Sequence, residues 1–116
     1  MTKALVAGLL LAMLTQGVFA GDGACEAAAK RADANPTLLV PRVYFAVTDG
    51  PRLFFYSAPD KACRLADKFV IAGDSLIGYS EFEGWTSVMF TKPNGDPVMG
   101  WVRSERLRAK GTLGGQ

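Results

Sequence analysis

The fold is decided by the stretch Gly84-Trp85-Thr86-Ser87-Val88-Met89-Phe90, which is followed further along the chain by Gly100-Trp101-Val102. Each Gly-Trp pair begins an apolar, strand-like segment, and Asn94-Gly95 lies between the two segments. An Asn-Gly pair in this position favours a type I′ hairpin turn, because both residue types tolerate a positive φ. We therefore predict a β-hairpin over residues 84–104 that carries both tryptophans of the chain.

Outside the hairpin, short β-forming segments alternate with Gly, Pro, Asn and Asp. We predict strands at residues 53–56, 68–71 and 76–79, and one edge strand, or two short pieces of one, at residues 37–48. Ser104 to Leu107 is predicted to form a short turn of helix or a last strand. Short strands at this spacing predict a small all-β barrel.

The N-terminus carries the pattern of a secretory signal peptide over residues 1–20. Lys3 precedes an uncharged run from Ala4 to Leu14, and Val18-Phe19-Ala20 suits cleavage before Gly21. The run is too short to span a bilayer, which needs about 20 residues. A buried N-terminal helix is the alternative. We expect a periplasmic or secreted protein whose mature chain has no membrane span.

Residues 21–116 leave 96 residues, which suffice for one domain. The net charge of +2 falls to +1 without Lys3, so the charge balance does not favour a nucleic-acid partner. The chain has no histidine, and two cysteines cannot complete a zinc site. We expect a monomer without metal or cofactor.

The two cysteines are Cys25 and Cys63. An even number of cysteines in an oxidising compartment favours a disulfide, and two free thiols are the alternative. The bond would hold the Ala-rich segment 21–36, which is predicted to be helical and to end at Pro36, against a barrel at residues 37–109. The Gly-rich tail, residues 110–116, is predicted to be disordered.

Four motifs occur in the order typical of the bacterial SH3-like (SH3b) domain, and the chain resembles that family over residues 52–108. They are Leu53-x-Phe55-x-Ser57-Ala58-Pro59, Gly73-Asp74, Gly84-Trp85-x-x-Val88 and Gly100-Trp101-Val102-x-Ser104-x-x-Leu107. The resemblance implies a five-stranded, strongly bent barrel with an overhanging loop at residues 57–68. Tyr56 and Ala58 depart from the family pattern, which commonly has Arg and Gly there. Cys63 resembles a subgroup of small exported proteins with a disulfide.

The resemblance also suggests a ligand-binding face. Strand alternation places Val88 and Phe90 inward with Leu53 and Phe55, and it places Trp85 on the opposite face. A Trp beside the long loop is similar to the groove Trp of peptide-binding SH3 relatives, or it packs under the loop. Trp101 is expected to cover the barrel end.

Arginines replace the residues that a proline-rich ligand would need at the final strand. Arg103 and Arg106 stand at positions similar to the Pro and Tyr of that groove, so a polyproline ligand is not favoured. Guanidinium groups bind carboxylates, and aromatic faces accept sugar rings or peptide planes. The candidate ligand-binding residues are therefore Tyr56, Tyr79, Trp85, Arg103 and Arg106.

The sequence favours a binding protein over an enzyme. Nucleophilic catalysis needs a base beside the nucleophile, most often a histidine, and the chain has none. Glu81 and Glu83 form a close carboxylate pair of the kind used in glycoside hydrolysis, but at the foot of a turn such a pair is more typical of a solvated edge. We expect a non-enzymatic SH3b-type module that recognises peptidoglycan or an envelope partner. The alternative is an immunity or inhibitor protein that blocks an exported toxin or cell-wall hydrolase.

Overall fold

The computed structural model describes residues 20–113, which form one α-helix, seven strands and two 3₁₀ helices. The elements are α1 (Ala20–Ala34), β1 (Thr37–Val47), β2 (Leu53–Tyr56), η2 (Lys61–Cys63), β3 (Arg64–Val70), β4 (Ser75–Phe82), β5 (Trp85–Thr91), β6 (Pro97–Arg103), η3 (Ser104–Arg106) and β7 (Leu107–Thr112). The predicted signal peptide lies outside the described residues, except for Ala20 at the start of α1.

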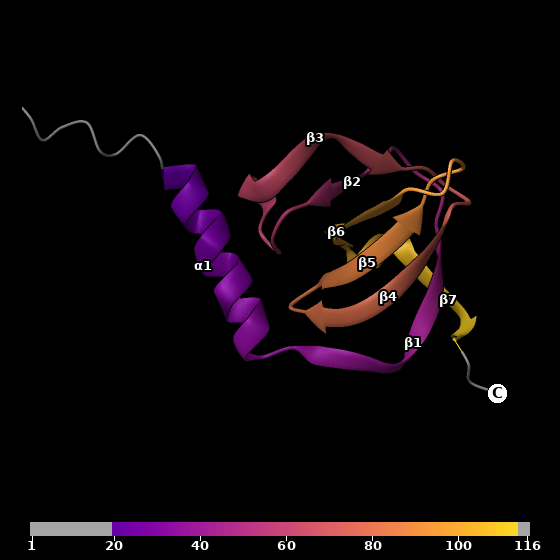
Figure 1. The fold of residues 1–116 in the computed structure, drawn as a ribbon, viewed down its shortest axis with the longest axis horizontal. Coiled ribbons are helices and arrows are strands. Elements are labelled where there is room, and N and C mark those ends of the chain that lie inside the picture. Colours follow the sequence, from indigo (N-terminus) through magenta and orange to yellow (C-terminus); the bar gives the residue numbers. More distant parts are fainter. Residues whose placement is uncertain (1–19, 114–116) are drawn as a thin grey trace, which may run out of the picture.

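All seven strands belong to one antiparallel, curved sheet with the order β3-β2-β6-β5-β4-β1-β7 (Figure 1). The predicted mainly β architecture with one N-terminal helix is confirmed. The predicted five-stranded barrel is wrong, because the sheet has seven strands and its two terminal strands, β3 and β7, do not pair with each other to close it within the described residues. β2 meets β6 through the single pair Tyr56–Trp101, so the β2–β3 hairpin diverges from the rest of the sheet.

The additional strands come from the two ends of the domain. The second half of β1 pairs with β4 from Val43 to Ala46 and with β7 from Val43 to Val47, so it is not an edge. Before Pro41 only β4 pairs with β1, and the register shifts between Leu38 and Val43. β7 continues to Thr112, which pairs with Val43, so the tail predicted to be disordered begins as strand.

The type I′ turn lies at the other end of β5 from the one predicted. Phe82 and Trp85 are cross-strand partners, and the two residues between them, Glu83 and Gly84, have φ of 47° and 87°. Two positive φ values in a two-residue loop define a type I′ hairpin. This turn fixes the start of β5, and therefore the face on which Trp85 lies.

Asn94-Gly95 belongs to a different turn, so the predicted type I′ turn at this pair is wrong. The Gly95 N–H donates to the Lys92 carbonyl at 2.8 Å, which places Pro93 and Asn94 at the central positions. Pro fixes φ near −65° and favours the first central position of type I and II turns. Gly95, with φ of 96°, then takes the left-handed position.

The core lies on the inner side of the curved sheet, as strand alternation predicts. Val88 is fully buried and Phe90 packs against the core, together with Leu53 and Phe55. Gly78 allows close packing here, because a Cβ at this position would collide with the ring of Phe45. The buried cluster comprises Phe45, Val47, Leu53, Phe55, Val70, Leu76, Val88 and Val102.

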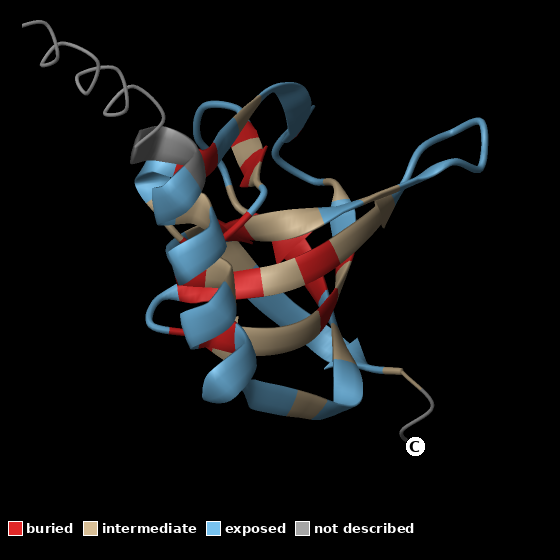
Figure 2. Cartoon of the chain, turned by 60° about the vertical axis from the view of Figure 1, so that its left-hand side comes forward, coloured by how far each residue is buried: buried red, intermediate tan, exposed pale blue. Residues whose placement is uncertain are grey.

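Helix α1 packs through small side chains and a covalent bond. The predicted disulfide between Cys25 and Cys63 is present, with a Cα–Cα distance of 5.7 Å. Ala28 is fully buried in a second cluster with Ala58 and Cys63, and Tyr56 packs against that cluster. One face of α1 is covered and the other is exposed (Figure 2). In residues 20–113 no helix has the length and apolar character needed to cross a membrane.

Candidate functional site

The structure brings together three of the five predicted ligand-binding residues on the outer side of the sheet. The Tyr56 and Trp85 rings meet edge to face, with centroids 4.8 Å apart and planes at 71°. The Arg103 guanidinium carbon lies 4.5 Å from the centroid of the Trp85 ring. Trp85 and Arg103 are cross-strand partners on β5 and β6, so strand pairing sets this stack.

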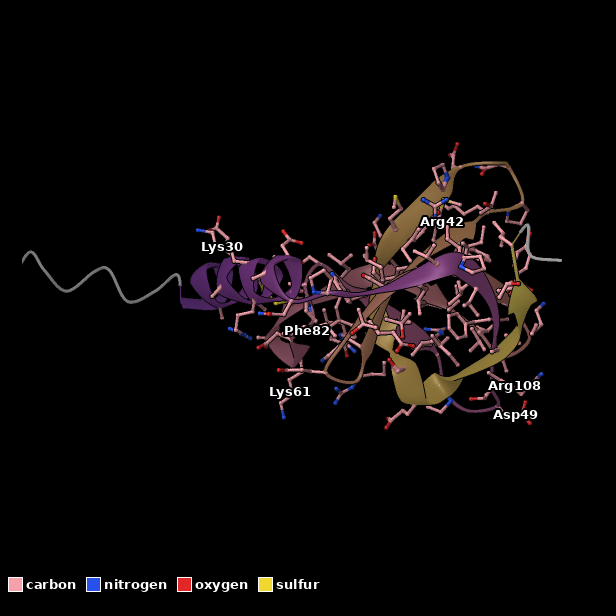
Figure 3. The ribbon with its side chains drawn as sticks, turned by 90° about the horizontal axis from the view of Figure 1, so that it is seen from below. Lys30, Arg42, Asp49, Lys61, Phe82 and Arg108 are labelled. Carbon is pink, nitrogen blue, oxygen red and sulfur yellow. A yellow bond between two sulfur atoms is a disulfide. The ribbon has the colours of Figure 1, made fainter. Side chains whose placement is uncertain are left out.

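Trp85 lies on the predicted face but is not accessible to a ligand. Its side chain is only 5% exposed. Tyr56, which contacts it, also packs against the cluster that holds Ala28 of α1. Phe82, the cross-strand partner of Trp85, is also buried and lies near α1 (Figure 3). Of the two alternatives for Trp85, a groove residue or a residue packed under the loop, its burial fits the second, because α1 and the segment after β2 cover this end of the face.

Trp101 lies on the same face as Trp85. The expectation that it covers a barrel end is not met, because the sheet of residues 20–113 is not closed into a barrel. Trp101 alternates with fully buried Val102 and pairs with Ser87 on one side and Tyr56 on the other. Cross-strand partners project to the same side of a sheet, so Trp101 lies on the outer face. The side chain is partly exposed, and Met99, two residues earlier, is 60% exposed.

Arg106 lies apart from this stack and bonds to the loop after β1. Its Nη2 donates to the Thr48 carbonyl at 2.9 Å, and its Nε donates to Thr48 Oγ1 at 3.4 Å. The Thr48 N–H donates in return to the Arg106 carbonyl at 2.9 Å. The guanidinium packs so closely on Gly50 that a Cβ there would lie 2.9 Å from Cζ. These contacts give Arg106 a structural role in holding the β1–β2 loop.

Tyr79 belongs to a third region, where β1 and β4 pair irregularly. Its hydroxyl donates to the Met89 sulfur at 3.7 Å, and the Arg42 guanidinium carbon lies 4.7 Å from its ring centroid. Tyr79 and Arg42 both line an open cavity of about 520 Å³. Figure 3 shows the position of Arg42 on β1. The other lining residues are Leu38, Leu39, Val40, Pro41 and Leu113.

The carboxylate pair considered for glycoside hydrolysis is divided between two backbone environments. Glu81 lies within β4 opposite Thr86, whereas Glu83 lies in the type I′ turn with a positive φ. The two residues therefore do not share the regular alternation of one strand. No group of three His, Cys, Asp or Glu side chains in the described part of the chain could hold a metal ion.

Sequence reasoning missed two features of the site. Thr86 is fully buried, and its hydroxyl lies 2.6 Å from the Ser104 hydroxyl, an interaction that joins β5 to η3. The second feature is the repeated stacking of arginine on aromatic rings, which depends on strand register. The sequence does show Arg and aromatic residues on neighbouring strands. It does not show which of them face each other, because that depends on the strand register.

Comparisons with protein-family models, with curated proteins and with solved structures find no match to this chain.

Proposed function

We propose that the protein is a non-enzymatic SH3-like binding module of the cell envelope that recognises peptidoglycan through carboxylates of the stem peptides. The order of the four motifs supports the SH3-like relationship, and the disulfide together with the N-terminal signal pattern supports export. The observation that carries the ligand proposal is the Arg103 guanidinium stacked on the buried Trp85 ring.

Arg103 is held in place before a ligand arrives. Its platform, Trp85, is almost fully buried and is itself braced by Tyr56, whereas Arg103 is exposed. Stacking uses the face of a guanidinium and leaves its N–H edge free to bind a carboxylate through two parallel hydrogen bonds. A side chain that is already ordered loses less conformational entropy when it binds.

Trp101 supplies the apolar part of the proposed site. It lies two residues before Arg103 on β6, on the same face, and it is partly exposed. An aromatic face beside a guanidinium suits a ligand that joins a sugar ring or a peptide plane to a carboxylate. The ligand-contacting residues of the proposal are therefore Arg103 and Trp101, with Trp85 and Tyr56 as support.

A sedimentation assay with purified peptidoglycan sacculi tests this proposal. We expect the mature protein to sediment with sacculi, and we expect Arg103→Ala and Trp101→Ala to reduce the bound fraction about tenfold, as for anchors of a binding site. Arg108→Ala is the matched control, because Arg108 is exposed and lies at the end of the domain away from α1 (Figure 3). Absence of binding by the unmodified protein contradicts the proposal.

A second candidate is an immunity or inhibitor protein, and the composition of the outer face favours it. Arg, Trp and Met are enriched in the centres of protein interfaces, and Arg103, Trp101 and Met99 follow one another on one face of β6. Co-purification with a secreted toxin or wall hydrolase, lost on Met99→Glu, would favour this role. Sacculus binding that survives Met99→Glu would favour the wall ligand.

A further inference from the structure

The outer face of the β2–β3 hairpin carries a row of four side chains that the proposed function does not use. Phe54 and Phe69 are cross-strand partners whose rings meet edge to face, with centroids 5.6 Å apart. The Arg64 guanidinium carbon lies 4.4 Å from the Phe54 ring centroid, and that of Arg52 lies 4.5 Å from the Phe69 centroid. We call these residues the Arg–Phe row.

The Arg–Phe row faces away from the core and is accessible. Leu53 and Val70, the next cross-strand pair, are buried, so alternation directs Phe54 and Phe69 to the outside. Phe69 is 37% exposed, and both arginines are exposed. β3 ends the sheet order, so no further strand of the described residues lies beyond it (Figure 1).

The hairpin carries a net positive charge. Residues 52–70 contain four basic side chains (Arg52, Lys61, Arg64, Lys68) and two acidic ones (Asp60, Asp67), a net charge of +2, whereas residues 21–116 as a whole carry +1. The Asp60 carboxylate is already used within the fold, where Oδ1 accepts a hydrogen bond of 2.8 Å from the Ala62 N–H. The hairpin thus complements a negatively charged partner.

We propose that the Arg–Phe row is a docking surface for an acidic protein segment in which carboxylates flank an apolar centre. The aromatic pair receives the apolar centre, because Phe69 is 37% exposed and Phe54 is partly exposed beside it. The guanidinium groups at its two ends stack on the rings and bind the carboxylates through their N–H edges. Arg52 directly precedes β2 and the other three residues lie on β2 and β3, so the row uses different side chains from Arg103 and Trp101 on β6. Tyr56, which pairs with both Arg64 and Trp101, lies between the two surfaces.

Fluorescence anisotropy with the peptide Glu-Glu-Leu-Phe-Glu-Glu-amide, labelled with a fluorophore at its N-terminus, tests this surface on the intact, disulfide-bonded protein. We expect binding that weakens as NaCl is raised from 50 to 300 mM, because the screening length shortens (about 10 Å at 0.1 M). A peptide with Lys in place of every Glu should not bind. The double variant Arg52→Ala/Arg64→Ala should lose about tenfold in affinity, as expected for paired charges at an interface.

The matched control is Arg31→Ala/Arg108→Ala, which removes the same charge from two exposed positions on α1 and β7. Equal loss of affinity in both double variants overturns the proposal, because it reduces the effect to net charge. Absence of binding by the unmodified protein also overturns it. Arg52→Lys/Arg64→Lys keeps the charge, and an affinity between the two extremes is expected because Lys lacks the planar fork. The Arg52→Ala/Arg64→Ala variant is also tested for sacculus binding. Unchanged sacculus binding together with the loss of peptide affinity separates this surface from the proposed wall site.

Discussion

Trp85 and Trp101 follow the same Gly-Trp pattern and lie on the same face of one hairpin, but their surroundings differ. Trp85 begins β5 directly after a type I′ turn and is 5% exposed, whereas Trp101 lies within β6 and is partly exposed. Strand alternation places both side chains on the outer face of the sheet. The difference comes from α1 and the segment after β2, which lie over one end of the face (Figure 2). Alternation predicts the face of a side chain, and the cover over that face decides its exposure.

The largest effect should come from removing the covalent bond that holds α1 near Trp85. Cys25→Ser/Cys63→Ser opens a loop of 38 residues, which the chain-entropy model values at about 4 kcal/mol of unfolding free energy. Chemical denaturation measures this loss. Release of α1 should also expose Trp85 more than Trp101. In the Trp101→Phe background, where Trp85 is the remaining tryptophan, Cys25→Ser/Cys63→Ser should therefore shift the fluorescence emission to longer wavelength. An unchanged unfolding free energy would show that α1 is not anchored by the bond.

The next largest effect on stability should be the difference between the two tryptophans. Trp85→Ala removes a buried ring and should cost about 3 kcal/mol, the lower end of the range for large aromatic residues in cores. Trp101→Ala removes a partly exposed ring and should cost about 1 kcal/mol. Urea denaturation of the two variants provides the comparison. Equal losses would contradict the different roles assigned to the two rings.

The two arginines predicted to bind ligand should also differ in how much each contributes to the free energy of unfolding. Arg106→Ala removes two hydrogen bonds to Thr48 and should cost about 2 kcal/mol, because hydrogen bonds to a charged group are stronger than neutral ones. Arg103→Ala removes one exposed stack and should cost about 0.5 kcal/mol. Thermal unfolding distinguishes them. A larger loss for Arg103 would reverse the assignment of Arg106 to structure and Arg103 to the proposed site.

The smallest effect concerns the two turns of the hairpin region. Gly84→Ala places a side chain at φ of 87° and should cost about 1 kcal/mol. Asn94→Ala removes an exposed hydrogen bond of 2.9 Å from the Asp96 N–H, which should cost about 0.5 kcal/mol. Unfolding free energies decide the order, and a larger loss at Asn94 would place the critical turn where the sequence predicted it.

Local chemistry made several elements predictable from the sequence. The alternation around Val88 and the apolar strand at Leu53 gave the core face, and the Ala-rich segment before Pro36 gave the helix. The pairing of Cys25 with Cys63 followed from their number and the expected compartment. Each of these depends on neighbours in the chain or on a choice among few partners.

Features that depend on distant partners were not predictable. β7 exists because Val43–Val47 offers a second pairing edge, and neither segment alone reveals this. Likewise, Arg106 contacts Thr48 across 58 residues of sequence, and Tyr79 meets Arg42 and not Trp85. Pro93 fixes a negative φ at the first central position of its turn, so the turn at Asn94-Gly95 is not type I′, whereas Glu83 and Gly84 both have the positive φ of that turn type. Side-chain cover and strand register are properties of the assembled sheet.

The most direct test of the contrast between the tryptophans is acrylamide quenching of two single-tryptophan proteins, Trp101→Phe and Trp85→Phe, with and without sacculi. Trp85, measured in Trp101→Phe, should be quenched weakly whether or not sacculi are present. Trp101, measured in Trp85→Phe, should be quenched more strongly when free and should become protected by sacculi. Stronger quenching of Trp85 than of Trp101, or protection of Trp85 by sacculi, would contradict the assignment of Trp85 to the support and Trp101 to the binding face.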